Sequence, residues 1–284
     1  MLTSRSVNPL AAKPDCPDCG GTGWIRVEDG GAGTARRCAC GRDLVGPRLL
    51  AAAGIPPKYA ECTLENFRTD APGGGKNVLV TARQRCRDYV DNFISLESGG
   101  FSERGLLLIG PPGVGKTHLA VAVLKELISR YGVRGRFIDF TGFISRIQST
   151  FDPSSEESKH EVLDPVLGAE VLVLDELGAQ KLTPFTQDIL YLVLNTRYNQ
   201  RRATLFTSNF RWPSRESAAA APREDALNQP HAFDLSTAAP ASPSLLSDRL
   251  PPNLISRLRE MARTIPIEDA EDYRKNAQRA RARG

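Results

Sequence analysis

The sequence predicts an α/β fold: a parallel sheet flanked by helices, preceded by a small metal-binding module. Three observations lead to this prediction. Short, continuous apolar runs such as 106–109 and 171–174 are typical of strands that are buried on both faces of a parallel sheet. A glycine-rich loop follows the first run and leads directly into a stretch with helical periodicity. Two pairs of closely spaced cysteines lie near the N-terminus.

The first 48 residues are expected to form the metal-binding module. Cys16 and Cys19 form a C-x₂-C pair, and Cys38 and Cys40 form a C-x-C pair further along the chain. Four thiolates can surround one Zn²⁺ tetrahedrally, and they leave no position for a catalytic water, so the predicted zinc is structural. The second pair is one residue shorter than usual, which leaves open whether both of its cysteines bind.

A β-hairpin is expected between the two cysteine pairs. Residues 24–27 have the composition of a strand, and a glycine-rich turn follows at 28–34. Two interpretations of the hairpin surface are equally compatible with the sequence. Either its side chains contact nucleic acid or protein, or the tryptophan packs against the zinc knuckle and the arginines are solvated; the residues concerned are Trp24, Arg26, Arg36 and Arg37.

The segment from 49 to 104 leads into the sheet. A short helix is predicted from Ala51, stopped by Gly54 and two prolines before Tyr59. Residues 77–95 carry apolar side chains at helical spacing. The stretch between these helices, 55–67, either wraps an adenine base or serves as a packing linker.

The central motif of the chain fits the phosphate-binding pattern G-x-x-x-x-G-K-[ST]. Its glycines let backbone N–H groups face phosphate oxygens, and the N-terminus of the following helix adds partial positive charge. The lysine can reach the β- and γ-phosphates, and the threonine hydroxyl can hold Mg²⁺. The sequence therefore predicts a site for a nucleoside triphosphate and Mg²⁺, formed by Gly110, Pro111, Pro112, Gly113, Val114, Gly115, Lys116 and Thr117.

Acidic residues follow the apolar run 171–174. Ligands in open α/β sheets collect at the carboxyl ends of strands, so Asp175 is expected in the Mg²⁺ shell. Glu176 is expected to act as the general base that deprotonates the attacking water. The next strand, 204–209, ends in Asn209, which can bind the γ-phosphate or that water.

Further elements complete the predicted core. A strand is expected at 135–140 and helices at 143–151 and 184–199, the last with Thr183 as its N-cap. Residues 213–247 are rich in Ala, Pro and Ser and are expected to form a disordered insertion. A helix over 254–262 and a short strand over 264–267 follow it.

These motifs together resemble a known family. Gly110–Thr117, Val171–Gly178 and Thr207–Asn209 resemble the Walker A, Walker B and sensor 1 motifs of AAA+ ATPases. The segments Leu174–Thr183 and Asn195–Asn199 resemble those of bacterial replicative helicase loaders of the DnaC/DnaI type and of the related IstB-type transposition ATPases. The resemblance covers roughly 55–274 apart from the insertion. It implies an AAA+ ATPase domain over 49–284, and the N-terminal cysteine motif also resembles the zinc module of DnaI-like loaders.

The resemblance implies further roles for residues near the C-terminus. Ser256-Arg257-Leu258 resembles the segment that carries an arginine finger, so Arg257 is expected to meet the γ-phosphate held by a neighbouring subunit. Asp272-Tyr273-Arg274 resembles the element that places sensor 2 at Arg274, although acidic residues replace the usual preceding glycine. Self-association through the ATP site is thereby implied.

The implied function is ATP-driven loading or remodelling of a replicative DNA helicase, with single-stranded DNA as a further partner. Two alternatives remain: a transposition helper ATPase that acts on target DNA, and a nucleotide-gated switch with negligible turnover. The zinc module favours a loader over a transposition helper, and the acidic pair argues against a pure switch.

Composition agrees with a cytoplasmic protein. Of 284 residues, 40% are hydrophobic, which is enough for a core, and the net charge of +4 permits a nucleic-acid partner without demanding one. No apolar run is long enough to span a membrane and the N-terminus has no signal-peptide pattern, so no membrane association is expected. Ten residues at the C-terminal end carry only basic charges, which either contact DNA or are solvated.

Overall fold

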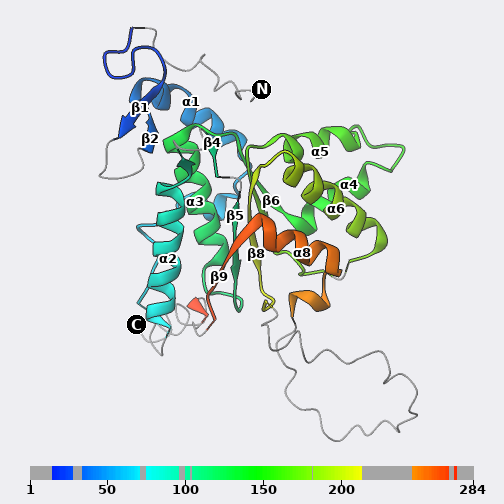
Figure 1. Cartoon of the computed structure of the whole chain (residues 1–284). Coiled ribbons are helices and arrows are strands. Elements are labelled where there is room, and N and C mark those ends of the chain that lie inside the picture. The colour runs from blue at the N-terminus through cyan, green and yellow to red at the C-terminus, as the bar shows by residue number, and fades with distance from the viewer. Residues whose placement is uncertain are drawn as a thin grey trace, which may run out of the picture.

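A five-stranded parallel sheet forms the centre of the computed structural model, which describes residues 15–27, 34–70, 75–95, 100–102, 104–180, 182–212, 245–268 and 272–273. The strands lie in the order β6-β7-β8-β5-β9 (Figure 1). Every neighbouring pair is parallel, as the apolar runs predict. The strands are β5 (Gly105–Ile109), β6 (Gly135–Asp139), β7 (Val171–Asp175), β8 (Ala203–Ser208) and β9 (Ala262–Pro266).

Helices connect these strands, because a parallel pair needs a crossover connection. The connecting helices are α3 (Lys116–Tyr131), α4 (Phe140–Ser149), α5 (Lys159–Gly168), α6 (Pro184–Asn199) and α8 (Pro252–Met261). The predicted start of α6 is confirmed, since the Thr183 side chain accepts a hydrogen bond from the Thr186 N–H. Among the described residues, none of the helices combines the length and apolarity needed to cross a membrane.

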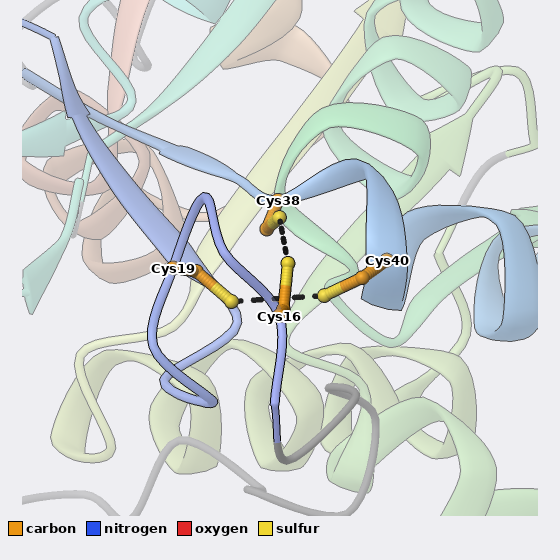
Figure 2. A group of neighbouring side chains, drawn as sticks. All are labelled: Cys16, Cys19, Cys38 and Cys40. Atoms are coloured by element: carbon orange, nitrogen blue, oxygen red, sulfur yellow. Dashed lines mark hydrogen bonds between the residues drawn. The ribbon is translucent and has the colours of Figure 1, made fainter.

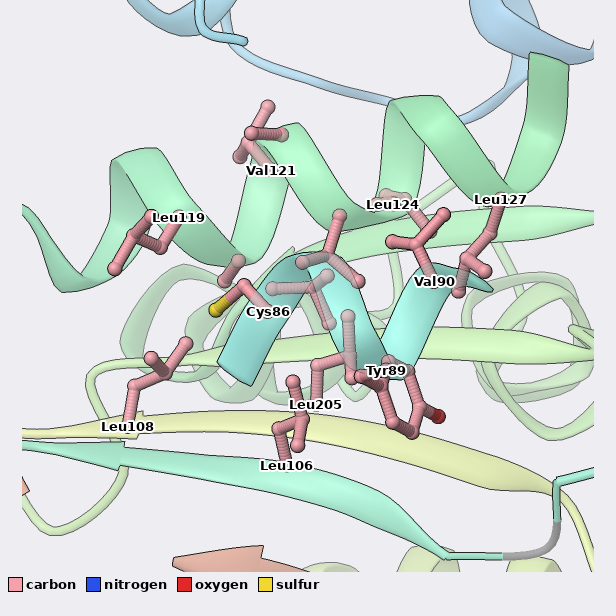
Figure 3. Close-up of a cluster of buried hydrophobic side chains, with 14 of the residues drawn as sticks. Cys86, Tyr89, Val90, Leu106, Leu108, Leu119, Val121, Leu124, Leu127 and Leu205 are labelled. Carbon is pink, nitrogen blue, oxygen red and sulfur yellow. The ribbon is translucent and has the colours of Figure 1, made fainter. Parts of the chain in front are cut away.

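Two apolar layers cover the two faces of the sheet. Alternate residues of β5 point in opposite directions. Leu106 and Leu108 pack in the cluster that contains side chains of α3 and of α2 (Lys76–Asp91), as Figure 3 shows. Leu107 and Ile109 pack in the opposite cluster, with residues of α4, α5, α6 and α8. The result is a three-layer α/β/α domain.

The N-terminal hairpin is present as predicted. Strand β1 (Trp24–Val27) pairs antiparallel with β2 (Thr34–Arg37). Trp24 is partly buried and has a packing role, but it packs against the cluster shared by α2 and α3, whereas Ile25 packs against the cysteine cluster. The side chains of Arg26, Arg36 and Arg37 lie outside the described part of the structure.

The helix after the hairpin crosses the predicted module boundary at residue 48. Helix α1 spans Ala39–Ala52, so the short helix predicted from Ala51 begins much earlier and ends sooner. A separate 3₁₀ turn, η2 (Pro57–Tyr59), follows it. The Phe137 N–H of β6 donates to the Ala53 carbonyl at 2.7 Å, which ties the end of α1 to the sheet. The module and the sheet are therefore joined by packed structure rather than by a linker.

The predicted helix over 77–95 ends earlier in the structure. Helix α2 stops at Asp91, and the chain then forms β3 (Ile94–Ser95), which pairs antiparallel with β4 (Gly100–Phe101). The Asn92 side chain and backbone N–H both donate to the Asp88 carbonyl, which satisfies the helix end.

The C-terminal end of the predicted insertion, 213–247, belongs to the folded domain. Residues 213–244 lie outside the described structure, but Leu245 forms a bridge with Arg211, and Leu246 is fully buried in the core. The short helix η4 (Leu246–Asp248) then leads to α8. Burial of Leu246 explains why the last three residues belong to the folded domain.

A buried arginine joins α5, α6 and β8. Arg197 has no exposed surface. Its guanidinium donates to the Thr204 hydroxyl and to three carbonyls, those of Val166, Ala169 and Ala203, at 2.6–3.1 Å. These bonds satisfy carbonyl groups at the end of α5 that would otherwise be buried without donors.

We expect Arg197→Ala to reduce the free energy of unfolding by about 3 kcal/mol or more, because it leaves a cavity and several buried acceptors without donors. Urea denaturation measures this loss. The control is Arg85→Ala on the exposed side of α2, for which we expect a change within about 0.5 kcal/mol. A loss no larger than that of the control would contradict the structural role of Arg197.

Candidate nucleotide and metal sites

The phosphate-binding loop runs from the end of β5 to the start of α3. Gly113 and Gly115 have φ angles of +82° and +92°, which glycine adopts without strain. A Cβ on Gly115 would lie 2.6 Å from the Phe67 ring, so this position also requires the absence of a side chain. The ammonium group of Lys116 lies inside the loop, donating to the Gly110 and Pro111 carbonyls at 2.8 and 2.7 Å.

The expected Mg²⁺ ligands lie together, Thr117 in the first turn of α3 and Asp175 at the end of β7. The Thr117 hydroxyl donates to the Asp175 carboxylate at 2.9 Å. Asp175 is 4% exposed, and burial raises the pKa of its carboxyl group, although hydrogen bonds from Thr207 and Thr117 lower it. A hydroxyl and a carboxylate are oxygen ligands that Mg²⁺ prefers, and a cation there would favour the charged carboxylate, so these residues fit the ion.

Thr207 is a member of this cluster that the sequence analysis did not single out. Its hydroxyl donates to Asp175 at 2.5 Å and accepts the Glu176 N–H at 3.0 Å. Because β8 lies between β5 and β7, a polar side chain at its end faces both motifs. The signal in the sequence was the polar run Thr207-Ser208-Asn209 at the end of an apolar strand.

Glu176 and Asn209 both lie at this carboxyl edge of the sheet, with exposed side chains. Glu176 has a φ angle of +59°, which non-glycine residues adopt at a cost and which is common at functional sites. The Leu177 N–H donates to the Thr207 carbonyl, and the Ser208 hydroxyl donates to the Leu177 carbonyl, so the turn after β7 is held against β8. The structure thus brings the predicted base and sensor to adjacent strand ends.

Residues 55–67, which precede the sheet in the chain, contact the start of α3. His118 Nε2 lies 2.8 Å from the Thr63 carbonyl, and the ring of His118 meets the edge of Phe67 at 5.3 Å between centroids. Residues 55–67 therefore lie beside the phosphate loop. The contact with an adenine base remains a proposal.

Of the two predicted C-terminal arginines, the structure describes only Arg257. Arg257 lies on α8, with its guanidinium 4.5 Å from the centre of the Tyr198 ring. Arg274 lies outside the described residues. Its neighbour Tyr273 does reach the phosphate loop, since its N–H donates to the Gly113 carbonyl at 3.2 Å.

The four N-terminal cysteines converge, as Figure 2 shows. All four sulfur atoms lie within 4.8 Å of one another. The Sγ atoms of Cys16 and Cys38 are 3.5 Å apart, and those of Cys19 and Cys40 are 3.6 Å apart. Tetrahedral zinc with bonds of about 2.3 Å places its sulfurs roughly 3.8 Å apart, so the cluster fits Zn²⁺.

Local structure explains how the short C-x-C pair can take part. Cys38 is the N-cap of α1, in extended conformation, and Cys40 lies in the first helical turn. This change of backbone direction brings both sulfurs to the cluster. The positive end of the helix also favours thiolates.

Hydrogen bonds support thiolates in the cluster. The Gly23 N–H donates to the Cys19 sulfur at 3.2 Å. Backbone hydrogen bonds from Cys19 and Asp18 lower the pKa of Cys16 to about 7. Thiols this close compete for ionisation, and a divalent cation removes that competition.

Several known proteins are similar to this chain in sequence. A family model described as IstB-like ATP binding protein matches residues 92–218. The replicative helicase loader DnaC of Escherichia coli (strain K12) is 29% identical over 162 residues, which are 57% of this chain and 61% of that protein. The phage-like element PBSX protein XkdC of Bacillus subtilis (strain 168) is 26% identical over 213 residues, covering 73% of this chain and 76% of that protein.

Solved structures are also similar to this chain in fold. A crystal structure of the DnaC helicase loader superimposes with a TM-score of 0.54 and 27% identity, covering 74% of this chain and 99% of that one. A crystal structure of DnaI, at 22% identity and a TM-score of 0.50, covers 75% of this chain and 94% of that one and shows the shared fold. The match spans less than two thirds of the length of the DnaC relatives.

Proposed function

We propose that this chain is an AAA+ ATPase, similar to IstB-like ATP-binding proteins, that loads or remodels a replicative DNA helicase. The observation that carries the proposal is the similarity to DnaC helicase loaders, which extends over 162 residues in sequence and over nearly all of a DnaC crystal structure. The four-cysteine module before the AAA+ domain adds support, as in the DnaI-like resemblance.

In the proposed mechanism, the phosphate loop binds the triphosphate of ATP. Lys116 exchanges its two carbonyl partners for phosphate oxygens, which keeps its buried charge compensated. Thr117 and Asp175 would hold Mg²⁺, which would neutralise phosphate charge. Glu176, on its strained turn, accepts a proton from the attacking water, and Asn209 orients that water or the γ-phosphate.

Hydrolysis in this proposal requires two subunits. Arg257 lies on α8, stacked on Tyr198, and would meet the γ-phosphate of a neighbouring subunit. Arg274 would act as sensor 2, as the resemblance implies, and its neighbour Tyr273 contacts the phosphate loop through the Gly113 carbonyl. ATP binding would thus couple self-association of the chain to binding of the helicase. The zinc module would contact the helicase or single-stranded DNA.

A direct binding experiment tests this function. The purified chain is mixed with the replicative helicase of the same host, with ATP and Mg²⁺ or with ADP, and complexes are separated by size-exclusion chromatography. We expect a complex in ATP that is lost with Lys116→Ala, which cannot hold the triphosphate. Absence of a complex in both nucleotides would reject helicase loading.

A transposition helper is the second candidate, favoured by the IstB-like family match. The same chromatography with a transposase of the host discriminates between the two. A nucleotide-dependent complex with the transposase alone would support this alternative.

A further inference from the structure

A basic pocket lies at the end of the sheet opposite the nucleotide site. Its volume is about 390 Å³. Arg104 immediately precedes β5, Arg202 immediately precedes β8, and Met261 immediately precedes β9, so the pocket lies at the amino ends of three neighbouring strands. The ATP motifs follow the carboxyl ends, and a strand as long as β8 separates the two edges by about 20 Å. The lining residues are Arg104, Arg197, Tyr198, Asn199, Arg201, Arg202, Glu260 and Met261.

Positive charge dominates the lining. Among the described lining residues, four are arginines and one, Glu260, is acidic; its carboxylate accepts the Tyr198 hydroxyl at 2.7 Å. The four hydrogen bonds from Arg197 go to uncharged oxygens. Burial, together with Arg202, lowers the pKa of Arg197 to about 9, so this arginine still carries its charge at neutral pH.

Backbone and side-chain bonds fix the positions of these arginines. Arg201 has a φ angle of +53° in the turn after α6, and its N–H donates to the Tyr198 carbonyl at 2.9 Å. The Arg104 guanidinium donates to the Arg259 carbonyl at 3.0 Å, and that of Arg202 donates to the Leu167 carbonyl. The guanidinium groups of Arg104 and Arg202 are therefore held in place and would lose little conformational entropy when an anion binds.

The rim of the pocket offers groups suited to a nucleotide. Arg104, Arg201 and Asn199 are exposed, and the Tyr198 side chain is 40% exposed. Arginine forks match phosphate oxygens, and the exposed part of the Tyr198 ring, which Arg257 leaves uncovered, can stack on a base.

We propose that this pocket binds phosphodiester groups of single-stranded nucleic acid, on the edge of the sheet away from the ATP site. The inference rests on the proposed function, since a protein that loads a helicase acts where single-stranded DNA is present. It assigns the contact with nucleic acid to the turn between α6 and β8 and to the residue that precedes β5. This site is distinct from the basic C-terminal residues and from the zinc module.

Fluorescence anisotropy of a labelled oligothymidylate, titrated with the full chain over a series of KCl concentrations, tests the proposal. The variant Arg104→Gln with Arg201→Asn removes two exposed charges, and Asn tolerates the positive φ angle. We expect roughly tenfold weaker binding and a salt slope smaller by about 1.4, at ~0.7 per phosphate contact. The control variant, Arg83→Gln with Arg85→Gln, removes two charges from α2 and should bind like the unmodified chain.

Several outcomes would overturn the proposal. They are equal losses in both variants, an unchanged salt slope in the pocket variant, tighter binding of a duplex of the same length, and equal displacement by polyglutamate. Thermal denaturation of both variants establishes that they are folded. If the unmodified chain binds no oligonucleotide while its helicase complex and ATP hydrolysis are intact, this inference fails and the proposed function stands. If the oligonucleotide binds at the pocket and no helicase complex forms, the proposed function fails alone.

Discussion

Glu176→Gln should lower the rate of ATP hydrolysis by at least about 100-fold while leaving ATP affinity within a few-fold of the unmodified chain. General-base catalysis contributes about 10²–10⁴-fold, and a glutamine at this position cannot accept the proton of the attacking water. ATP affinity depends instead on the loop around Lys116 and on the Thr117–Asp175 pair, which the substitution does not touch. Phosphate release at saturating ATP and titration with a fluorescent ATP analogue measure the two quantities separately.

Glu156→Gln is the matched control for this experiment. Glu156 is an exposed glutamate in the turn before α5 and away from the phosphate loop, so the same chemical change should leave turnover unaltered. If the unmodified chain hydrolyses ATP no faster than Glu176→Gln, the enzyme assignment fails. The chain would then act as a nucleotide-gated switch.

Local sequence patterns were sufficient to predict the central strands of the sheet and the position of the glycine-rich loop between β5 and α3. The apolar runs at β5, β7 and β8 are buried along their whole length, which is why composition alone identified them. The phosphate loop could also be predicted, because its chemistry depends on residues that are consecutive in the chain. The structure places Asp175 at the end of β7, bonded to Thr117, and its position could be predicted because its motif and its strand end are local features; its part in the Mg²⁺ shell stays a prediction.

Other features depend on contacts between distant segments. Arg197 looks like a surface residue of a helix, and its burial becomes visible only when the end of α5 and the start of β8 meet around it. Thr207 joins the site because β8 lies between β5 and β7, an order that no single segment specifies. The predicted module boundary at residue 48 falls inside α1. The composition of the sequence changes there, whereas the helix continues and packs on β6.

The parallel sheet also explains why the two proposed activities lie apart. All five strands point the same way, so polar residues that follow strands gather at one edge and residues that precede strands gather at the other. The ATP motifs occupy the first edge and the arginine pocket occupies the second. Helix α6 spans this distance, from Thr183 near the acidic motif to the pocket at Tyr198.

Removal of zinc should unfold the N-terminal hairpin, and we expect this to be the largest effect on stability among the changes considered. Structural zinc contributes about 10–16 kcal/mol in zinc-finger peptides, and two strands alone are at best marginally stable in water. The cluster's sulfurs are nearly all buried, so a double variant Cys16→Ser with Cys38→Ser removes half of the predicted ligands. We expect this variant to lose one equivalent of zinc, measured by elemental analysis, and to be cleaved by protease within the hairpin.

The consequences of zinc removal should extend beyond the hairpin. Trp24 and the end of α1 pack against the main core, and the Ala53 carbonyl is bonded to β6, so the thermal midpoint of the whole domain should fall as well. Cys62→Ser provides the control: this buried cysteine lies outside the cluster, so the variant should keep its zinc and a protected hairpin. A chain that holds no metal when purified with zinc, or a Cys62→Ser variant that loses it, would contradict a structural zinc at these four sulfurs. Because α1 begins at the cluster and ends on the sheet, a stable hairpin without zinc would also mean that packing against α3 alone holds it in place.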